Sequence, residues 1–256
     1  MRILITNDDG IHSPGLDVLA RVARTISEDV WVVAPETDQS GVAHSLSLND
    51  PLRLREVGER RFAVKGTPTD CVILGARHVL KDGLPDLLLS GVNRGHNLAE
   101  DITYSGTVAG AIEGALLGIP AIALSQGYPG GFRDKVDYSA AEVHGRRVIE
   151  RVLEAGLPRG GLVNVNFPPL PAEKIAGLRA TVQGQRSQWQ AQVEQRRDGR
   201  GNPYFWVIVG HEIGDPDADT DLKAVSEGYI SVTPLKVDMT DHALKKKFDR
   251  AIEGGS

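Results

Sequence analysis

The sequence predicts an α/β fold, in which helices cover both faces of a mostly parallel, doubly wound sheet. Short apolar runs without polar alternation recur along the chain, and segments with helical spacing lie between them. Such runs are typical of strands that are buried on both faces, as in three-layer α/β/α domains. We therefore expect a domain of this class over residues 1–182 and a β-rich C-terminal region over residues 183–256.

The first 35 residues have the pattern of one β-α-β unit. An apolar run at residues 3–5 is followed by apolar residues at helical spacing between Leu16 and Ile26, and then by a second apolar run at residues 30–33. A strand, a helix and a strand in this order build a pair of parallel strands. Further strands are predicted from three more apolar runs, at residues 86–90, 121–124 and 162–166.

The segments between the predicted strands predict helices. The alternation of strand and helix is interrupted at residues 52–64 and beyond residue 182. Helices are expected after Thr67-Pro68, which offers an N-cap and a proline at the first helical position, and over residues 107–117 and 143–153. Residues 52–64 alternate between apolar and charged side chains, which predicts a hairpin outside the main sheet. Beyond residue 182 we expect strands at 204–209 and 228–234, an acidic loop at 214–221 and a terminal helix from about residue 241.

Composition excludes several classes of protein. The 256 residues are 41% hydrophobic and carry a net charge of −5 without a basic stripe, which disfavours a partner of duplex nucleic acid but allows a small anionic substrate. The one cysteine, Cys71, lies in an apolar run and is expected to be buried. Neither a signal peptide nor a run of the ~20 apolar residues that span a bilayer is found, so we expect a cytoplasmic protein without a membrane partner.

Two adjacent acids, Asp8 and Asp9, follow the first predicted strand. In open parallel sheets, ligands bind beyond the carboxyl ends of the strands. Neighbouring carboxylates repel each other and need a cation or strong donors, and Mg²⁺ prefers a few such oxygen ligands. The pair followed by Gly10 therefore indicates a partly open metal site, although a simple Asp-Gly turn is an equal alternative for these residues alone.

Other phosphate and metal motifs are missing from the sequence. It contains no G-x-x-x-x-G-K-[ST], and the acidic turn occupies the position of a G-x-G-x-x-G after the first strand. These absences count against a P-loop enzyme and a dinucleotide dehydrogenase. The sequence also lacks an H-E-x-x-H motif and a Cys/His cluster for zinc.

Polar loops follow the other parallel strands and should lie at the same edge of the sheet. They cover residues 35–45 and 90–97, and Ser105-Gly106-Thr107 opens a helix of small residues. A helix N-terminus with hydroxyl groups and glycine is suited to binding an anion, although a plain Ser/Thr cap is the simpler explanation for this feature alone. The convergence of acids, amides and hydroxyls on one edge favours a phosphate site.

These motifs together resemble the stationary-phase survival protein SurE family. The resemblance covers nearly the whole chain in order, through residues 7–15 (NDDGIHSPG), 40–41 (SG), 66–72 (GTPTDCV), 90–97 (SGVNRGHN), 104–109 (YSGTVA), 220–221 (TD) and 227–235 (EGYISVTPL). It implies a Rossmann-like domain with an extended C-terminal β-hairpin that is exchanged between the subunits of a homodimer or homotetramer. Residues 183–201 are the part of the chain that resembles the family least.

The resemblance also implies an activity and a set of ligands. It implies a nucleotidase that hydrolyses nucleoside 5′- and 3′-monophosphates with one divalent metal ion per subunit, Mg²⁺ or Mn²⁺, and some members also cleave short polyphosphate. The metal ligands implied by motif position are Asp8, Asp9, Ser40 and Asn93. We expect Asp8 and Asp9 to be catalytic as well, and the phosphate to be bound by Asn97, Ser105, Gly106 and Thr107.

Several alternatives stay open at the level of sequence. The general acid for the leaving oxygen is not identified, since His12, His44 and His96 all lie on loops that face the expected site, and Arg94 is equally a phosphate ligand or a solvated side chain. A metal-dependent deacetylase and a non-catalytic nucleotide-binding module are the rival functions. In a third alternative, the C-terminal hairpin makes the protein a scaffold.

Overall fold

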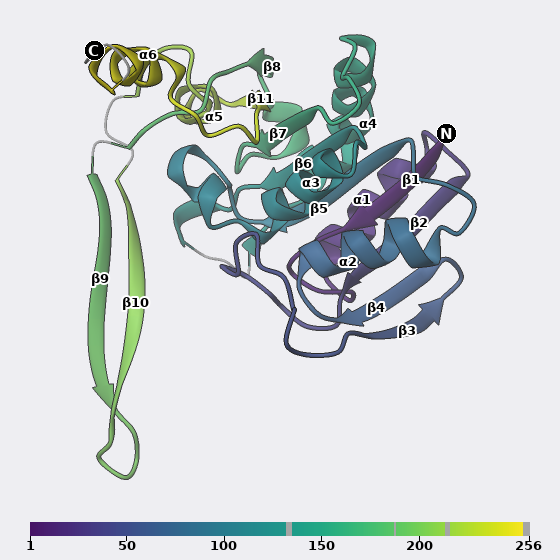
Figure 1. Ribbon diagram of the computed structural model, residues 1–256, viewed down its shortest axis with the longest axis horizontal. Helices are drawn as coiled ribbons and strands as arrows, with labels where there is room; N and C mark the ends of the chain where they lie inside the picture. The colour runs from purple at the N-terminus through teal and green to yellow at the C-terminus, as the bar shows by residue number, and fades with distance from the viewer. Residues whose placement is uncertain (132–134, 187, 213–215, 253–256) are drawn as a thin grey trace.

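The computed structural model describes residues 1–131, 135–186, 188–212 and 216–252. Its centre is a nine-stranded sheet in the order β3-β4-β2-β1-β5-β6-β7-β11-β8, with helices on both faces (Figure 1). A separate two-stranded hairpin, formed by β9 (Gln188–Arg197) and β10 (Pro203–Glu212), extends away from this body. The expected α/β fold with a mostly parallel sheet and a C-terminal hairpin is confirmed.

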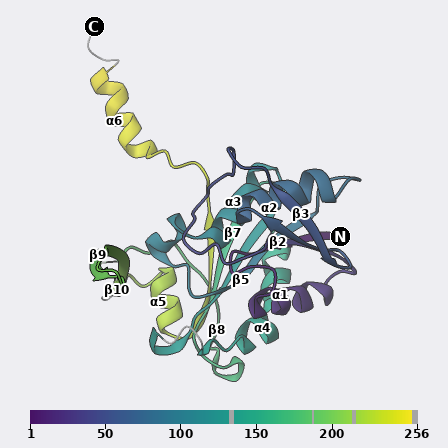
Figure 2. The same cartoon turned by 90° about the horizontal axis from the view of Figure 1, so that it is seen from below.

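The strands of the main sheet are β1 (Arg2–Thr6), β2 (Asp29–Pro35), β3 (Arg53–Gly58), β4 (Arg61–Lys65), β5 (Leu87–Arg94), β6 (Ala121–Gln126), β7 (Leu162–Phe167), β8 (Gly177–Ala180) and β11 (Tyr229–Leu235). The α-helices are α1 (Pro14–Arg24), α2 (Pro68–Leu74), α3 (Gly106–Leu116), α4 (Ser139–Glu154), α5 (Asp221–Ser226) and α6 (His242–Ile252). Of these, α6 lies beyond the body at the end of a connecting segment (Figure 2).

Six neighbouring strands run parallel, which brings their carboxyl ends to one edge of the sheet. β1 pairs in parallel with β2 on one side and with β5 on the other, and the last residue of β1, Thr6, lies opposite Ser90 of β5. β6 and β7 continue the parallel set beyond β5. The segment that follows Thr6 therefore emerges where the loops after β2 and β5 also begin.

The core has two layers, one on each face of the sheet. Ile3 and Ile5 point to the face that α1 and α4 cover, whereas Leu4 points to the face covered by α2 and α3. All three side chains are fully buried, which explains why β1 is apolar without alternation.

Local capping residues set where the helices begin. The Ser13 side chain accepts a hydrogen bond at the start of α1, and Thr67 and Asp70 form a reciprocal capping box at the start of α2, each helix with a proline in its first turn. The Ser105 hydroxyl accepts from the Val108 amide at the start of α3. The caps at Thr67 and Ser105 were predicted from the sequence, whereas the cap at Ser13 was not.

The expectation that residues 52–64 form a hairpin outside the main sheet is wrong. The segment does form the antiparallel pair β3–β4, but β4 also pairs in parallel with β2, where Val33 lies opposite Phe62. Ala63 and Val64 are buried as a result. Apolar residues on β4 need cover, and the free edge of β2 offers it together with unpaired backbone groups.

The C-terminal region does not remain separate from the sheet. β11 lies within the range assigned to that region, yet it pairs antiparallel with β7 and in parallel with β8. The expected acidic loop is wrong at its end, because Asp221 opens the helix α5 after an N-cap at Thr220. Residues 214 and 215, which belong to the same prediction, lie outside the described residues. The division of the chain at residue 182 stays a prediction.

Two other predictions differ in extent. β5 runs to Arg94 rather than ending at Ser90, so that part of the expected polar loop at residues 90–97 belongs to the strand, and a short 3₁₀ helix (Ala99–Thr103) precedes α3. The terminal helix α6 is confirmed. Within the described residues, none of the helices is long and apolar enough to cross a membrane.

Candidate active site

The two acids that follow β1 lie at the carboxyl edge of the sheet. Asp8 is 3% exposed, and the side chain of Asp9 is 2% exposed. Two carboxylates in a row are seldom buried without compensating partners. The chain segments that supply those partners therefore identify the rest of the site.

The start of α3 holds Asp8. The Thr107 hydroxyl donates a hydrogen bond of 2.6 Å to Oδ1 of Asp8. A Cβ atom on Gly106 would lie 2.8 Å from the Asp8 Cβ, so the helix approaches this closely because position 106 has no side chain. We expected Gly106 to admit a phosphate, and the structure adds that Asp8 itself occupies the space beside it.

The same glycine pattern continues along α3. A Cβ on Gly110 would lie 2.9 Å from Thr6 Cγ2, and one on Gly114 would lie 2.3 Å from Leu88 Cδ2. The three glycines are spaced by four residues and thus share one face of the helix. This face lets the N-terminus of α3 reach the end of β1.

Burial raises the pKa of the Asp8 carboxyl to about 7. The Thr107 hydrogen bond opposes this effect, whereas the neighbouring charge of Asp9 adds to it. A carboxylate in this position is stabilised by any added cation. The buried, neighbouring carboxyl groups of Asp8 and Asp9 therefore form an acidic site that is suited to a positively charged ligand.

Asp9 is held from the end of β5. The backbone amide of Arg94 donates to Oδ2 of Asp9 at 2.9 Å, and Nε of the Arg94 guanidinium lies 3.7 Å from Oδ1. Nη2 of the same guanidinium lies 3.4 Å from Oδ2 of Asp38. Arg94 thus lies between two acids of this edge, which favours a role in charge balance over that of a solvated loop arginine.

The loop after β2 also closes over the edge. The Gln39 amide donates to the Asp8 carbonyl oxygen at 2.7 Å, which brings Ser40 to the same end of the sheet as Asp8. The Ser40 hydroxyl and amide both donate to Oδ1 of Asp38, at 2.6 and 2.8 Å. Ser40 therefore has the expected location, with its hydroxyl directed to a neighbouring acid.

Asn93 lies near the end of β5, opposite Ser125 of β6. Its side-chain amide donates to the Gly95 carbonyl oxygen at 3.0 Å, which leaves the amide oxygen as the group that could bind a cation. The four residues predicted as metal ligands all come from this edge of the sheet.

Asn97 is embedded in polar groups of β6 and β7. Its amide donates to Asn166 Oδ1 and its side chain donates to Ser125 Oγ, both at 2.8 Å. Its carbonyl oxygen accepts from the side chains of Asn164 and Asn166. These two asparagines were not predicted as site residues; their signal in the sequence is a polar residue at every second position of an otherwise apolar strand.

A pocket of about 500 Å³ adjoins Asp9. Its lining is formed by Asp9, Gly10, His12, Ser13, Pro14, Glu36, Arg94, Val136 and Tyr138. Glu36 and Tyr138 were not identified from the sequence, because they come from the end of β2 and the start of α4 and carry no motif of their own. The pocket is next to the acids, partly apolar and wide enough for a small organic group.

The three histidines left open by the sequence have different surroundings. His96 is half-buried, its Nε2 lies 2.9 Å from the Phe167 carbonyl oxygen, and the loss of water around the ring lowers its pKa. His44 pairs with Glu113 of α3 at 3.0 Å. Only His12 of the three lines the pocket described above. The structure thus favours His12 as the histidine that could meet a ligand there.

The donor set fits a hard divalent cation. Within the described ranges, no group of three or more His, Cys, Asp or Glu side chains could hold a metal ion. The four residues predicted as ligands at this edge offer two carboxylates together with hydroxyl and amide oxygens. Such oxygen donors are suited to Mg²⁺ or Mn²⁺, whereas a zinc site would need imidazole or thiolate.

Comparisons with known proteins identify the family of the chain. The family model described as "Survival protein SurE" matches residues 3–190. The chain is 60% identical over 251 residues to "5'-nucleotidase SurE" of Methylorubrum extorquens (strain PA1), covering 98% of this chain and 99% of that one. A similar relative from Azorhizobium caulinodans, with the same name, is 59% identical over 253 residues and covers 99% of each chain.

A solved structure extends the likeness to three dimensions. The "Crystal Structure of Sure Protein from Aquifex aeolicus" matches with a TM-score of 0.84 at 40% sequence identity, and it covers 98% of this chain and 99% of that chain. The sequence match and the structural match both span nearly the whole length. The chain belongs to the survival protein SurE family.

Proposed function

We propose that this protein is a divalent-metal-dependent nucleotidase that hydrolyses nucleoside 5′- and 3′-monophosphates to nucleoside and phosphate. Relatives about 60% identical over nearly the whole chain carry the name 5'-nucleotidase SurE, which supports a phosphomonoesterase acting on nucleotides. Short polyphosphate is a further candidate substrate, since it presents the same terminal phosphoryl group.

The observation that carries the proposal is the contact between Asp8 and the N-terminus of α3. An acidic residue of a cation site and a helix end suited to a phosphate are joined by the Thr107 hydrogen bond of 2.6 Å. A phosphoryl group bound next to this contact would face the cation on one side and the backbone donors of the helix on the other.

We propose that Asp8, Asp9, Ser40 and Asn93 hold the metal ion, one per subunit. When bound, Mg²⁺ or Mn²⁺ would supply Lewis acidity toward a phosphoryl oxygen and offset the charge of the two acids. Asp8 and Asp9 would orient the attacking water by accepting a hydrogen bond from it. Arg94, beside Asp9, would add a second positive charge near the phosphate.

Phosphate binding is assigned to Asn97, Ser105, Gly106 and Thr107. The first amides of a helix have no acceptor one turn earlier, so the start of α3 is a source of N–H donors. Thr107 would act in part through Asp8, to which its hydroxyl is already bonded. The Asn97 side chain has two N–H donors, and Ser125 takes one of them.

The pocket beside Asp9 is the space that we assign to the nucleoside. Tyr138 and Pro14 supply apolar surface there, while His12 and Glu36 supply polar groups. His12 is the side chain in this lining that could donate a proton to the leaving ribose oxygen.

A phosphate-release screen tests the proposal. Nucleoside 5′- and 3′-monophosphates and a short polyphosphate would be assayed with Mg²⁺, Mn²⁺ and a chelator. We expect metal-dependent turnover of the nucleotides, and a loss of about 100-fold or more in kcat/KM for Asp8→Asn, because removal of an active-site charge commonly costs this much. Asp17→Asn, which alters an exposed acid of α1, is the matched control and should retain activity.

Other outcomes would select the rival functions. Tight nucleotide binding without turnover across the metals would favour a binding module, and release of acetate from acetylated substrates would favour a deacetylase. Full activity of Asp8→Asn without added metal would contradict the proposal.

We also propose that the β9–β10 hairpin mediates self-association into a homodimer or homotetramer. Phe205, Trp206, Val207 and Ile208 lie on β10 and are between 44% and 69% exposed. Consecutive exposed apolar residues on a protruding ribbon are typical of a surface that another chain covers. A protein that is fully active as a monomer in solution would contradict this part of the proposal.

A further inference from the structure

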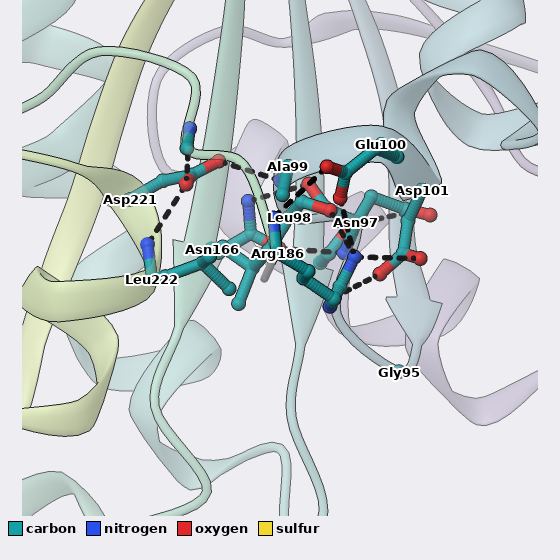
Figure 3. A network of polar contacts seen from close by, with 12 residues as sticks. Gly95, Asn97, Leu98, Ala99, Glu100, Asp101, Asn166, Arg186, Asp221 and Leu222 are labelled. Atoms are coloured by element: carbon teal, nitrogen blue, oxygen red, sulfur yellow. Dashed lines mark hydrogen bonds and ion pairs between the residues drawn. The ribbon is translucent and has the colours of Figure 1, made fainter. Parts of the chain in front are cut away.

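A polar network joins the segment 97–101 to the base of the β9–β10 hairpin (Figure 3). The segment follows β5 and includes Asn97, to which we assign phosphate binding. On one side it rests on the asparagines of β7, as described above. On the other side it meets residues that come from much later in the chain.

Asp221 supplies the first of these contacts. Its carboxylate is fully buried and accepts three backbone N–H groups, from Ala99 at 3.0 Å, Gly184 at 2.9 Å and Leu222 at 2.8 Å. The three amides belong to three separate segments of the chain, so one side chain fixes their relative positions. Burial raises the pKa of this carboxyl, and the three amides oppose that effect.

Arg186 supplies the second set of contacts. Its side chain is 4% exposed, and Nη2 lies 2.7 Å from Oδ2 of Asp101. Nη1 donates to Oδ1 of Asp101 at 3.1 Å and to the Leu98 carbonyl oxygen at 3.2 Å. The Arg186 backbone amide donates to Oε1 of Glu100 at 2.9 Å. Through its guanidinium and its backbone amide, Arg186 thus contacts three residues of the segment 97–101.

Both side chains belong to the two ends of the hairpin. Arg186 lies two residues before β9, and Asp221 lies nine residues after the end of β10. The two ends are tied to each other as well, because the Asp221 amide donates to the Val182 carbonyl oxygen at 3.0 Å. The hairpin base and the segment 97–101 therefore form one hydrogen-bonded unit.

Stability alone is a weak explanation for such an arrangement. Buried ion pairs are often no more stabilising than apolar residues of the same volume, since both charges lose their hydration. A network of satisfied polar contacts does, however, fix the backbone in a single geometry. The backbone fixed here is the segment 97–101, whose first residue is Asn97.

We propose that Asp221 and Arg186 are positioning residues, which set the segment 97–101 so that Asn97 presents its side-chain amide to the phosphate. The inference rests on the proposed function, in which Asn97 is a phosphate ligand. Neither residue touches the substrate in this assignment, and both act through the backbone of the segment.

Two variants test the proposal from opposite sides of the segment. Asp221→Asn keeps the shape of the side chain but replaces one acceptor oxygen by an NH₂ group, which should free the Ala99 amide. Arg186→Lys keeps the charge but loses the fork that holds Asp101. The matched control is Arg179→Lys, which alters a half-buried arginine of β8 that pairs with Glu227 outside the network.

Kinetics and phosphate binding provide the first readout. If Asn97 binds the phosphate equally in the ground and transition states, its displacement should raise KM for a nucleoside monophosphate about tenfold and leave kcat within about twofold. The dissociation constant of inorganic phosphate, measured by calorimetry with Mg²⁺ present, should rise by a similar factor. Arg179→Lys should match the wild type in both measurements.

Amide hydrogen exchange provides a readout that is independent of catalysis. In both variants we expect exchange at residues 97–101 to accelerate by about tenfold or more, while that of β1 stays unchanged. Equal acceleration in β1 would mean general destabilisation and would overturn the proposal, as would unchanged KM and phosphate affinity in both variants. If the wild-type protein hydrolysed none of the nucleotides, the proposed function would fail, whereas exchange and phosphate affinity would still test the positioning role.

Discussion

The hydroxyl of Thr107 donates a hydrogen bond of 2.6 Å to the buried carboxylate of Asp8, although the two residues are 99 positions apart. Thr107 lies in the first turn of helix α3, and Asp8 lies just after strand β1. From the sequence, Thr107 is expected to bind the phosphate and Asp8 the metal, as members of separate groups. Because of this contact, any shift of the start of α3 would displace Asp8. The positions of the expected phosphate-binding residues and of the expected metal ligands are therefore coupled.

Thr107→Val should lower activity without unfolding the protein. The variant keeps the shape of the side chain but removes the donor, and a hydrogen bond to a charged group contributes about 1.5–3 kcal/mol. We expect kcat/KM for a nucleoside monophosphate to fall about 10- to 100-fold. Thr107→Ser keeps the hydroxyl and should recover most of the activity. Equal losses in the two variants would mean that methyl packing matters rather than the hydrogen bond.

Gly106→Ala should lower both stability and activity. Alanine in a helix usually gains about 0.5–1 kcal/mol over glycine. The added Cβ would lie 2.8 Å from the Asp8 Cβ, however, and overpacking of this kind costs about 1–3 kcal/mol, so the clash should win. We expect a lower Tm in thermal unfolding and weaker metal-dependent phosphate release.

The control for this substitution is Gly199→Ala in the hairpin loop. A Cβ at that position meets nothing within 4 Å, so the change should leave Tm and activity unaltered. A Gly106→Ala variant as active and as stable as the wild type would show that α3 has room to move away from Asp8.

His96 should make the protein less stable in mild acid. Burial lowers the pKa of His96 below its usual value of 6.5 in the folded state. The unfolded chain therefore binds a proton more readily, and the stabilising contribution of the neutral ring is complete above pH 6.5 and declines as the pH falls below it. Urea unfolding between pH 7.5 and 5 should show this decline in the free energy of unfolding.

His96→Gln should flatten that dependence, because its amide can still donate to the Phe167 carbonyl oxygen but does not titrate. His78→Gln, at an exposed position, should keep the wild-type pH profile. If His96→Gln and the wild type lost stability in parallel below pH 6.5, the decline would belong to other groups.

Charged residues on the hairpin should weaken self-association. The double variant Phe205→Glu with Trp206→Glu alters two side chains that are 59% and 55% exposed, so the fold of one subunit should tolerate it. If a second chain covers this surface, burial of the new charges is unfavourable and the mass measured by light scattering should fall to that of a monomer. Gln195→Glu, on the paired strand β9, is a milder control for added charge. An unchanged mass in the double variant would place the interface elsewhere.

Most elements of the fold follow from local signals in the sequence. The run at residues 3–5 and the caps at Thr67 and Ser105 predict β1 and two helix starts, because hydrophobic spacing and capping depend on nearby residues only. The pairing of β4 with β2 was missed, since an alternating hairpin looks the same whether its edge is free or occupied.

The candidate site divides in the same way. The location of Asp8, Asp9, Ser40 and Asn93 at one edge is predictable, because parallel strands have their carboxyl ends in common. The surroundings of Asn97 among the asparagines of β7 are not, and neither is the lining of the pocket by Glu36 and Tyr138. These depend on which helix and strand ends meet in space.

The sequence by itself determined the α/β class, the order of the main strands and helices, the acidic pair after β1 and the family resemblance. Only the tertiary structure decided that Thr107 bonds to Asp8, that Gly106 is required by the bulk of Asp8, and that Asp221 reaches Ala99 across 122 positions. The reason is that periodicity and caps act within a few residues, whereas these contacts arise when distant segments pack and must satisfy each other's buried polar groups.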